Sequence, residues 1–432
     1  MKKSLILVQL LLVLLCGCKS DRSSVLKVYN WSNYIDEPVI GEFEKWYKEQ
    51  TGEKIHVIYQ TFDINETMLT KIEKGHEDFD VVCPSDYIIE RMLNEDLLLP
   101  LDFEALPEGM NYIENNRSPY VREVFSKINP NIDANNYSVA FMWGTTGILY
   151  NPAYVTDEEA STWEVIRNPK FAGKILIKDA PRDVYSPVLI HLKQDELASG
   201  AITLDDVMLD SSEESIAAVE SYMKDVKKLV AGWEADFGKE QMTQNRAYLS
   251  LNWSGDAVWA IEEAAEVGVE LRYAVPKEGS NVWFDGWVIP KYSRNVKAAT
   301  YFIDFLCRPD IAIRNMEVTG YVSANGDKSL LESQIDESFE PIDLSYFFGE
   351  GAESVCVDPV LYPDRSTIEK CALMHDWGQD SDRLIAMWSR VKGENANGMT
   401  LIITGLAVVV IAFLAIRKIF FGKSRSRRHG RK

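Results

Sequence analysis

The chain has 432 residues, of which 46% are hydrophobic and 26% charged, so it is long enough for two packed lobes and too apolar to be disordered. Its formal net charge is -20, but two lysines near the start and eight basic residues beyond Ile416 leave the residues between them with 36 positive and 66 negative charges, about -30. Such a surface repels nucleic acid and anionic lipid headgroups and attracts cations, although an acidic surface also serves solubility.

Residues 1–18 have the order of a secretory signal. Lys2 and Lys3 precede an uncharged run from Leu5 to Leu15, which is too short for a comfortable membrane span. The following "LCGC" resembles a bacterial lipobox, in which the signal is cut before a cysteine, here Cys18, that then carries lipid. An ordinary cleaved signal with incidental cysteines is the alternative.

Short apolar strands alternate with amphipathic helices after the signal. "VLKVYNW" from Val25 is expected to be a strand, and a helix with apolar residues at helical spacing should end at Gly52. "KIHVIYQTF" predicts a strand, Asn65 is expected to cap the helix "ETMLTKIEKG", and "FDVVCPS" predicts another strand. This βαβ alternation indicates a doubly wound sheet.

A second set of elements predicts a second lobe. Strands are expected at residues 137–151 and 174–179, a long helix from Ser212 to Trp233, and then strand, turn and helix in "AYLSLNWSGDAVWAIEEA". "NVWFDGWVIP", from Asn281, also has a strand pattern. We therefore expect an α/β fold of two doubly wound lobes, with ligands bound at the carboxyl ends of the strands.

The C-terminal part holds a second candidate membrane segment. Residues 399–416 carry no charge and are long enough to cross most of a hydrocarbon core of about 30 Å, although a buried core helix is the bland alternative. The residues after them are almost all basic or small, and positive flanks stay in the cytoplasm. We therefore predict a linker at 395–398, a transmembrane helix at 399–416 and a basic cytoplasmic tail at 417–432.

The cysteines outside the signal do not indicate a disulfide framework. Cys83 and Cys307 have the surroundings of buried apolar residues, whereas Cys356 and Cys371 could pair in an oxidising compartment or remain free. His375 near Cys371 lacks a second ligand pair, so no metal site is predicted.

Aromatic and acidic residues recur just after the predicted strands. They lie in "NWSNY" (residues 30–34), "PSDY" (84–87), "DAPRDVY" (179–185) and "NWSGD" (252–256). Together with "VPKEGSNVWFDGWVIP", "FLCRPD" and "TGYVSAN", and in this order, these blocks resemble the periplasmic spermidine/putrescine-binding proteins of polyamine ABC importers. The resemblance runs from about Leu26 to about Lys392.

This resemblance implies a periplasmic-binding-protein fold of two lobes that close about a hinge, with an amine held between them. It also implies a ligand site by motif position. An aromatic box would be formed by Trp31, Tyr34, Tyr87, Trp253, Trp283 and Tyr321, with a hydroxyl or backbone contact from Ser85 and carboxylates from Asp183 and Asp285.

The chemistry of these residues suits that ligand. A polyamine is a chain of methylenes with a charge at each nitrogen, so aromatic faces can cover the methylenes and attract the ammonium groups while carboxylates add charge-assisted hydrogen bonds. A buried Asp285 without a cation would cost several kcal/mol. Taken singly, the aromatics could be core residues and Asp183 could be a helix N-cap.

The sequence departs from the family pattern at two positions. Ala180 stands where spermidine-type members have an acid, and Asp183 stands where a longer Glu is common. These differences leave the preferred amine open. Alternation predicts that Trp283, Asp285 and Trp287 share one face of their strand, with Phe284 on the other; the resemblance assigns Trp283 and Asp285 to the ligand and leaves Phe284 and Trp287 for packing.

We therefore expect a polyamine-binding protein, monomeric and without a cofactor, that delivers putrescine or spermidine to an ABC transporter permease. It would lie on the periplasmic face of the cytoplasmic membrane. The binding domain would span 25–394, with one lobe at about 25–136 and 260–320 and the other at about 137–259 and 321–394.

Two other functions stay open at this point. One is a polyamine sensor or scaffold that acts on a membrane partner, which the membrane tether would also suit. The other is a glycosidase-like enzyme, since such enzymes also place acids and aromatics in a cleft. No paired catalytic carboxylates, nucleophile elbow, metal spacing or phosphate loop is recognisable, so we expect no enzyme activity.

Overall fold

The computed structural model describes residues 22–107, 110–234 and 238–393. The predicted signal with Cys18, the linker at 395–398, the transmembrane helix at 399–416 and the basic tail lie outside these residues. Within the described ranges, no helix is both long enough and apolar enough to cross a membrane.

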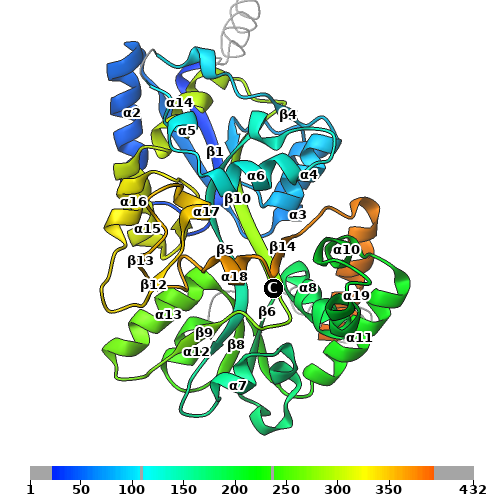
Figure 1. The fold of residues 1–432 in the computed structure, drawn as a ribbon. Coiled ribbons are helices and arrows are strands. Elements are labelled where there is room, and N and C mark those ends of the chain that lie inside the picture. The colour runs from blue at the N-terminus through cyan, green and yellow to red at the C-terminus, as the bar shows by residue number, and fades with distance from the viewer. Residues whose placement is uncertain (1–21, 108–109, 235–237, 394–432) are drawn as a thin grey trace, which may run out of the picture.

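The upper lobe in Figure 1 is built on a parallel β-sheet, as the βαβ pattern predicts. Strand β1 (Val25–Trp31) pairs in parallel with β2 (His56–Phe62) on one side and β3 (Val81–Val82) on the other. The other elements of its first part are α2 (Pro38–Thr51), α3 (Asn65–Glu73), α4 (Asp86–Asn94), β4 (Leu98–Leu99), α5 (Tyr112–Asn115) and α6 (Pro119–Lys127). Helix α2 ends where expected, because Gly52 adopts the left-handed conformation, with a φ of 75°, that closes its last turn.

The same sheet continues into the lower lobe, where β6 (Ile175–Lys178) is parallel to both β7 (Val230–Glu234) and β8 (Leu249–Trp253). Strand β9 (Arg272–Ala274) completes its edge. Its helices are α7 (Asp157–Ala160), α8 (Pro181–Leu192), α9 (Gln194–Ser199), α10 (Leu204–Leu209), α11 (Glu213–Val226), α12 (Gly238–Thr243) and α13 (Ser254–Glu266).

Two long strands join the lobes. The first half of β5 (Ser138–Tyr150) pairs with β10 (Ser280–Pro290), and its second half pairs with β8 of the lower lobe. At its far end β10 pairs with β3 of the upper lobe. Figure 1 shows both strands running from one lobe into the other. The third connection contains β14 (Cys371–Leu373), which runs parallel to the start of β10. These strands are the connections between the lobes.

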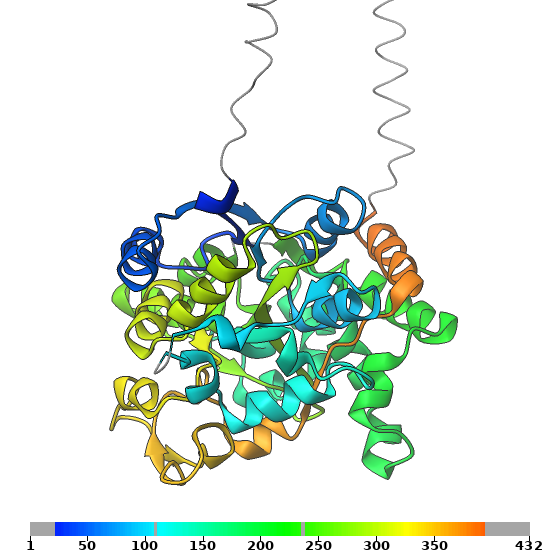
Figure 2. The ribbon, with the colours of Figure 1, turned by 90° about the horizontal axis from the view of Figure 1, so that it is seen from above.

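The remaining elements complete both lobes. They are α14 (Val296–Leu306), α15 (Pro309–Thr319), β11 (Val322–Ser323), α16 (Lys328–Ser333), β12 (Pro341–Ile342), α17 (Ser345–Phe348), β13 (Val355–Cys356), α18 (Arg365–Ile368) and α19 (Ser381–Lys392). Short 3-10 helices lie at η1 (Arg22–Ser24), η2 (Phe103–Ala105), η3 (Ala134–Asn136), η4 (Trp163–Arg167), η5 (Pro169–Phe171) and η6 (Gly378–Asp380). Figure 2 shows that η1 and α19, the two ends of the described fold, lie along the same side of the molecule.

The boundaries between the two lobes fall at other residues than the sequence predicts. Helix α13 packs its alanines against Leu149 and Leu271 in the lower lobe, whereas the expected boundary cut this helix at 260. Leu330, Phe347 and Tyr362, expected in the second lobe, lie in the core of the upper one. The reason is that the chain enters the upper lobe on β10 and stays there, with β11 pairing to β5, until it returns through β14.

Two local predictions are also wrong. The helix expected over residues 212–233 ends at Val226, and the chain continues as β7, in which Trp233 packs edge-on against Trp388 of α19. No turn separates β8 from α13, because Trp253 ends the strand and caps the helix directly. In both places tertiary packing prevails over the local apolar pattern.

The four cysteines of the described residues, Cys83, Cys307, Cys356 and Cys371, are free. The pairing of Cys356 with Cys371 that the sequence left open is therefore not formed.

Candidate functional site

Asp285 lies at the junction of the two lobes, where the pairing of β10 with β5 is irregular. The register of β10 against β5 shifts between Asp285 and Gly286, and the Gly286 amide donates to the Pro84 carbonyl at 3.0 Å. Asp285 and Ser85 form an isolated antiparallel bridge. The extra residue at this shift is Phe141 of β5, so β10 itself keeps the expected alternation. Trp287 contacts the Phe141 ring, which also contacts the Tyr34 ring beside Asp285, whereas Phe284 stacks on Trp143.

Neutral donors hold the Asp285 carboxylate. The Tyr34 hydroxyl donates to Oδ2 at 2.8 Å and the Ser85 hydroxyl donates to Oδ1 at 2.6 Å. Burial raises the pKa of Asp285 to about 6 although both hydrogen bonds lower it, and the Asp183 carboxylate raises it further. The described residues place no cationic side chain in an ion pair with Asp285, so its charge is desolvated and not neutralised.

Ser85 belongs to a chain of hydrogen bonds that reaches Tyr87. The Asn65 amide donates to the Ser85 hydroxyl at 3.0 Å and to the Tyr87 hydroxyl at 3.1 Å, and Tyr87 donates to Glu66 at 3.2 Å. Asn65 is not the helix cap that we expected, because Ile64 occupies the N-cap position and Asn65 begins α3. Its side chain instead orients the serine that binds Asp285.

Three rings lie edge to face beside the carboxylate. The Tyr321 ring centroid is 5.2 Å from that of Tyr34 and 5.7 Å from that of Trp283. Two glycines make room for this arrangement, since a Cβ at Gly255 would overlap the Tyr321 ring and one at Gly144 would lie 2.7 Å from the Trp283 ring. The indole N–H of Trp283 is buried without a hydrogen-bond partner in the described part of the chain.

Trp31 ends β1 next to the same junction. Its ring centroid lies 4.6 Å from that of Phe62. Trp31 packs against buried residues on both sides of the upper sheet, and its indole lies close enough to Asp285 to lower the pKa of that carboxyl. The buried Trp283 indole is a polar group that a bound solute or water could satisfy.

The lower lobe contributes Asp183 and Trp253. Asp183 is the third residue of α8, whose N-cap is Ala180, so it does not cap the helix. Its Oδ1 accepts from the Trp253 indole at 3.0 Å and from the Asn281 amide at 3.5 Å. Burial raises the pKa of Asp183, and Asp183 in turn raises that of Asp285, so the two carboxylates lie within electrostatic reach.

Asp179, the nearest acid to the position held by Ala180, is used elsewhere. It accepts from the Trp388 indole at 2.8 Å and pairs with Lys392 at 2.7 Å, both on α19. It is thereby committed to holding the last described helix on the lower lobe.

Arg182 makes a contact between the lobes that the sequence analysis did not consider. Its guanidinium lies 4.9 Å from the Tyr87 ring centroid of the upper lobe and 4.4 Å from that of Trp377, and it donates to the His375 carbonyl. Because the side chain is buried, this cation and its aromatic partners hold the lobes together on one side of the site.

All the residues predicted from the sequence lie around this junction. Tyr34, Ser85 and Asp285 share hydrogen bonds, Trp283 and Tyr321 join them through ring contacts, Asp183 and Trp253 bind each other, and Tyr87 is reached through Asn65. Sequence reasoning missed Asn65, Lys178, Arg182 and Asp256. Asp256 could have been predicted, because it ends the block "NWSGD". In the structure the Tyr321 hydroxyl donates to it at 2.9 Å.

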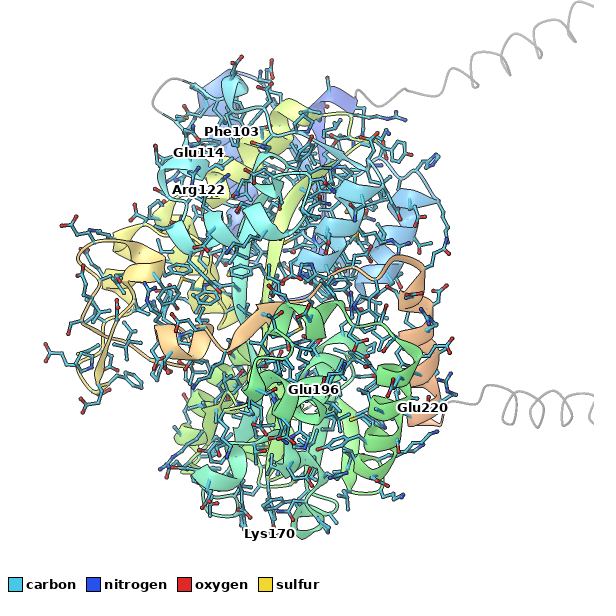
Figure 3. All side chains as sticks on the ribbon, turned by 45° about the vertical axis from the view of Figure 1, so that its right-hand side comes forward. Phe103, Glu114, Arg122, Lys170, Glu196 and Glu220 are labelled. Atoms are coloured by element: carbon cyan, nitrogen blue, oxygen red, sulfur yellow. The ribbon has the colours of Figure 1, made fainter. Side chains whose placement is uncertain are left out.

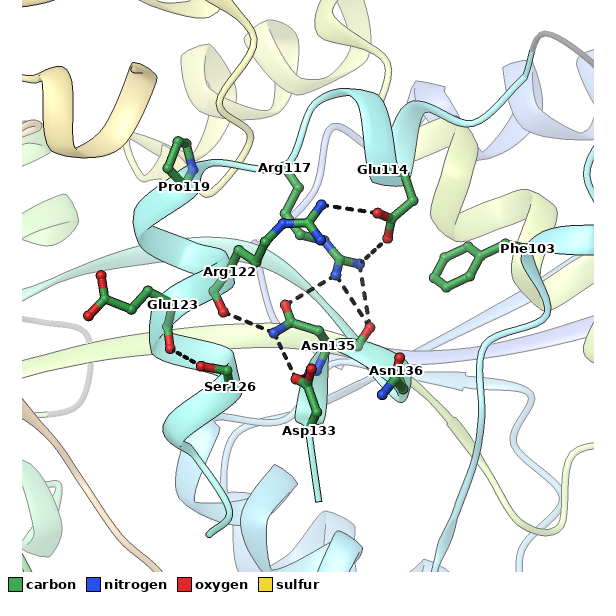
Figure 4. Close-up of a pocket in the computed structure, with 10 residues that line it drawn as sticks. All are labelled: Phe103, Glu114, Arg117, Pro119, Arg122, Glu123, Ser126, Asp133, Asn135 and Asn136. Carbon is green, nitrogen blue, oxygen red and sulfur yellow. Dashed lines mark hydrogen bonds and ion pairs between the residues drawn. The ribbon is translucent and has the colours of Figure 1, made fainter. Parts of the chain in front are cut away.

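A surface depression of about 540 Å³ lies elsewhere, on the upper lobe (Figure 4). Glu114 pairs there with Arg117 at 3.2 Å and with Arg122 at 3.0 Å, and Arg117 also donates to Asn135 at 3.1 Å. Figure 3 shows Glu114 and Arg122 far from Glu220 of the lower lobe. None of the predicted site residues lines the depression.

The described residues contain no group of three or more histidine, cysteine, aspartate or glutamate side chains arranged to hold a metal ion. The junction brings together aromatic rings, hydroxyl groups and the carboxylates of Asp183 and Asp285. This set can bind a cationic, partly apolar solute.

The family model described as "Bacterial extracellular solute-binding protein" matches residues 42–336. The spermidine/putrescine-binding periplasmic protein of Escherichia coli is 28% identical over 380 residues, which cover 86% of this chain and 93% of that protein. The putrescine-binding periplasmic protein PotF of E. coli is 28% identical over 321 residues, covering 72% and 80%.

A solved structure has the same fold. The spermidine/putrescine ABC transporter substrate-binding protein PotD of Streptococcus pneumoniae is 30% identical, with a TM-score of 0.61, over 85% of this chain and 99% of that one. The two-lobed α/β periplasmic-binding-protein fold expected from the sequence is thereby confirmed.

Proposed function

Because this chain belongs to the bacterial extracellular solute-binding protein family, we propose that it binds a polyamine of the putrescine and spermidine class in the periplasm and delivers it to an ABC importer. Its relatives are substrate-binding proteins of ABC transporters, which are not enzymes, and neither is this chain. The relatives named for polyamines cover most of the described fold, which supports this ligand class over other solutes of the family.

The observation that carries the proposal is the buried carboxylate of Asp285, held only by neutral donors among aromatic rings. A buried carboxylate is costly unless a cation neutralises it, and an ammonium group on an apolar chain is the cation that rings can also cover. Asp183 offers a second carboxylate of the same kind from the other lobe. A diamine that reaches both would bind the lobes to each other.

Binding would favour the closed arrangement of the lobes. Trp31, Tyr34, Trp283 and Asp285 come from the upper lobe and from β10, whereas Asp183 and Trp253 come from the lower lobe. A ligand that contacts both sets has a higher affinity for the closed state than for an open one, so it shifts the population toward closure.

We further propose that the protein works as a monomer tethered to the outer face of the cytoplasmic membrane, by residues 399–416 and by lipid on Cys18. The ends of the described fold lie along one side, an arrangement that fits two anchors in one membrane. Mass spectrometry of the mature N-terminus tests the lipid, and extraction of membranes with carbonate tests the tether. Recovery of the full-length chain in the carbonate wash would contradict the tether.

A thermal-shift comparison tests the ligand class. The full-length protein, purified in mild detergent, is heated with putrescine, spermidine and 1,4-butanediol, which has the carbon chain of putrescine with neutral ends. We expect the amines to raise the melting temperature and the diol to leave it unchanged, because only the amines neutralise the carboxylates. If no di- or polyamine raises the melting temperature, the proposal is contradicted.

A further inference from the structure

Beside the predicted site lies a second cage of rings and carboxylates, which is already filled by the protein. The ammonium of Lys178, at the end of β6, lies 2.6 Å from Asp256 and 3.1 Å from Glu234, and 4.2 Å from the centroid of the Trp253 ring. The Lys178 side chain is 1% exposed. A buried ammonium between carboxylates and over an indole face has the surroundings of a bound amine.

The charges of this cage are balanced without a ligand. Lys239 also pairs with Asp256, at 3.3 Å, so two lysines face two carboxylates. Burial opposes the charge on Lys178, but Asp256 and Glu234 outweigh it and raise the pKa of the lysine. Burial likewise opposes the charge on Asp256, and Lys178 with Lys239 outweighs it and lowers the pKa of that carboxyl.

Asp183 and Asp285 are in the opposite situation. Their hydrogen bonds come from Tyr34, Ser85, Trp253 and Asn281, which are all neutral, and within the described ranges neither carboxylate forms an ion pair. Asp285 therefore has no cationic partner among the described residues, and Asp183 has only the electrostatic influence of Lys178, whereas two lysines already occupy the neighbouring cage.

The two regions are continuous. Tyr321 packs against Tyr34 and Trp283 and donates to Asp256, while Trp253 donates to Asp183 and lies under Lys178. An extended amine bound at Asp285 and Asp183 would direct any further ammonium toward the Trp253 face, which the lysine covers.

We propose that Lys178 is a specificity-determining residue, a built-in ammonium that fills the cage of Trp253, Glu234 and Asp256 and restricts the site to a short diamine. This inference rests on the proposed polyamine function and adds which member of the class is preferred. Beyond its Cβ, lysine carries three methylenes and an ammonium. Spermidine is putrescine extended by the same group, an aminopropyl chain, so Lys178 takes the place of the part that distinguishes the two ligands.

The test is calorimetric titration of the full-length protein and its Lys178→Ala variant with putrescine and with spermidine. We expect the native protein to prefer putrescine. In Lys178→Ala the ratio of the two dissociation constants should move toward spermidine by about tenfold or more, because the vacated cage gains an unneutralised carboxylate and a free indole face. Lys178→Arg retains the cation and should retain the preference for putrescine.

Two further variants keep the result interpretable. Lys193→Met removes another lysine–aspartate pair of the lower lobe, with Asp210 at 2.6 Å, and should leave the ratio unchanged. If Lys178→Ala does not fold, Lys178→Ala/Glu234→Gln removes one charge of each sign. It should show a smaller shift toward spermidine, because the Trp253 face is freed while Asp256 stays paired with Lys239.

The outcomes separate this inference from the proposed function. A native protein that prefers spermidine, or a folded alanine variant with an unchanged ratio, overturns the role of Lys178 while polyamine binding stands. A native protein that binds neither amine contradicts polyamine binding itself.

Discussion

Burial of the Asp285 carboxylate costs free energy, and the same carboxylate is the proposed partner of a cationic ligand. It is 6% exposed and its hydrogen-bond donors are all neutral, so its charged form is stabilised less by the protein than by water. Family members that bind a cation would turn this cost into affinity, because the ligand supplies the missing charge. The residue could be found from the sequence since a lone carboxylate among rings in "VWFDGW" is unusual for a buried strand.

Asp285→Asn should weaken amine binding by at least about tenfold, because the amide cannot neutralise an ammonium. The same change should raise the melting temperature of the unliganded protein at neutral pH, because it removes a buried charge. Calorimetry and thermal melts measure the two effects.

Asp304→Asn is the matched control. Burial also raises the pKa of Asp304 to about 6, but its carboxylate accepts from the Ile113 backbone amide and takes no part in the junction. Amine affinity should therefore stay at its native value. Equal affinities in the Asp285 and Asp304 variants would show that Asp285 is structural.

The pH dependence of the stability of the unliganded protein follows from the raised pKa of Asp285. The pKa of Asp285 rises from 3.8 to about 6 on folding, so between these values the folded protein holds more protons than the unfolded chain. The stability of the unliganded protein should thus increase as the pH falls through about 6 toward 4, by an amount on the order of 2 to 3 kcal/mol.

Amine affinity should change in the other direction, falling as the pH drops below about 6, because a protonated Asp285 no longer attracts an ammonium. Titrations at pH 7.5, 6.5 and 5.5 measure it. The account is contradicted if native affinity is the same at all three pH values, or if Asp285→Asn shows as large a pH dependence as the native protein.

Among the elements, α19 shows what the local pattern could and could not predict. Its amphipathic sequence predicts a helix. The sequence does not predict the partners of this helix, because they are α8 and α11, more than 150 residues earlier in the chain. The expected helix over residues 212–233 failed for the same reason: Trp233 fits a helix by spacing, yet it packs with Trp388 from a strand. Asn65 was assigned to capping because only the folded chain brings Ser85 and Tyr87 to its amide.

Trp388→Ala should lower the free energy of unfolding by about 3 kcal/mol, because it removes a buried ring that packs on Trp233 and a hydrogen bond to Asp179. Urea denaturation measures the change. Ile385→Ala, on the exposed side of the same helix, should change stability by less than about 0.5 kcal/mol. If the two variants unfold alike, α19 is not held in the manner described.

At the scale of the whole molecule, the two lobes could be predicted, and so could the gathering of the candidate residues at the junction, because ordered blocks of aromatic and acidic residues follow the strands. The lobe boundaries could not. They depend on where β5, β10 and β14 cross, and a strand that leaves one lobe for the other has the same apolar pattern as a strand that stays. Lys178 was overlooked because a single lysine at a strand end is ordinary in sequence and acquires its meaning only from Glu234, Trp253 and Asp256.

The most direct test of the central claim is calorimetric titration of the full-length protein with putrescine, beside the Asp285→Asn variant. The account predicts one diamine per protein molecule, saturable heat for the native protein, and an affinity lower by at least about tenfold for the variant. Saturable binding of equal affinity in both proteins, or no heat from the native protein at any concentration of putrescine, would contradict it.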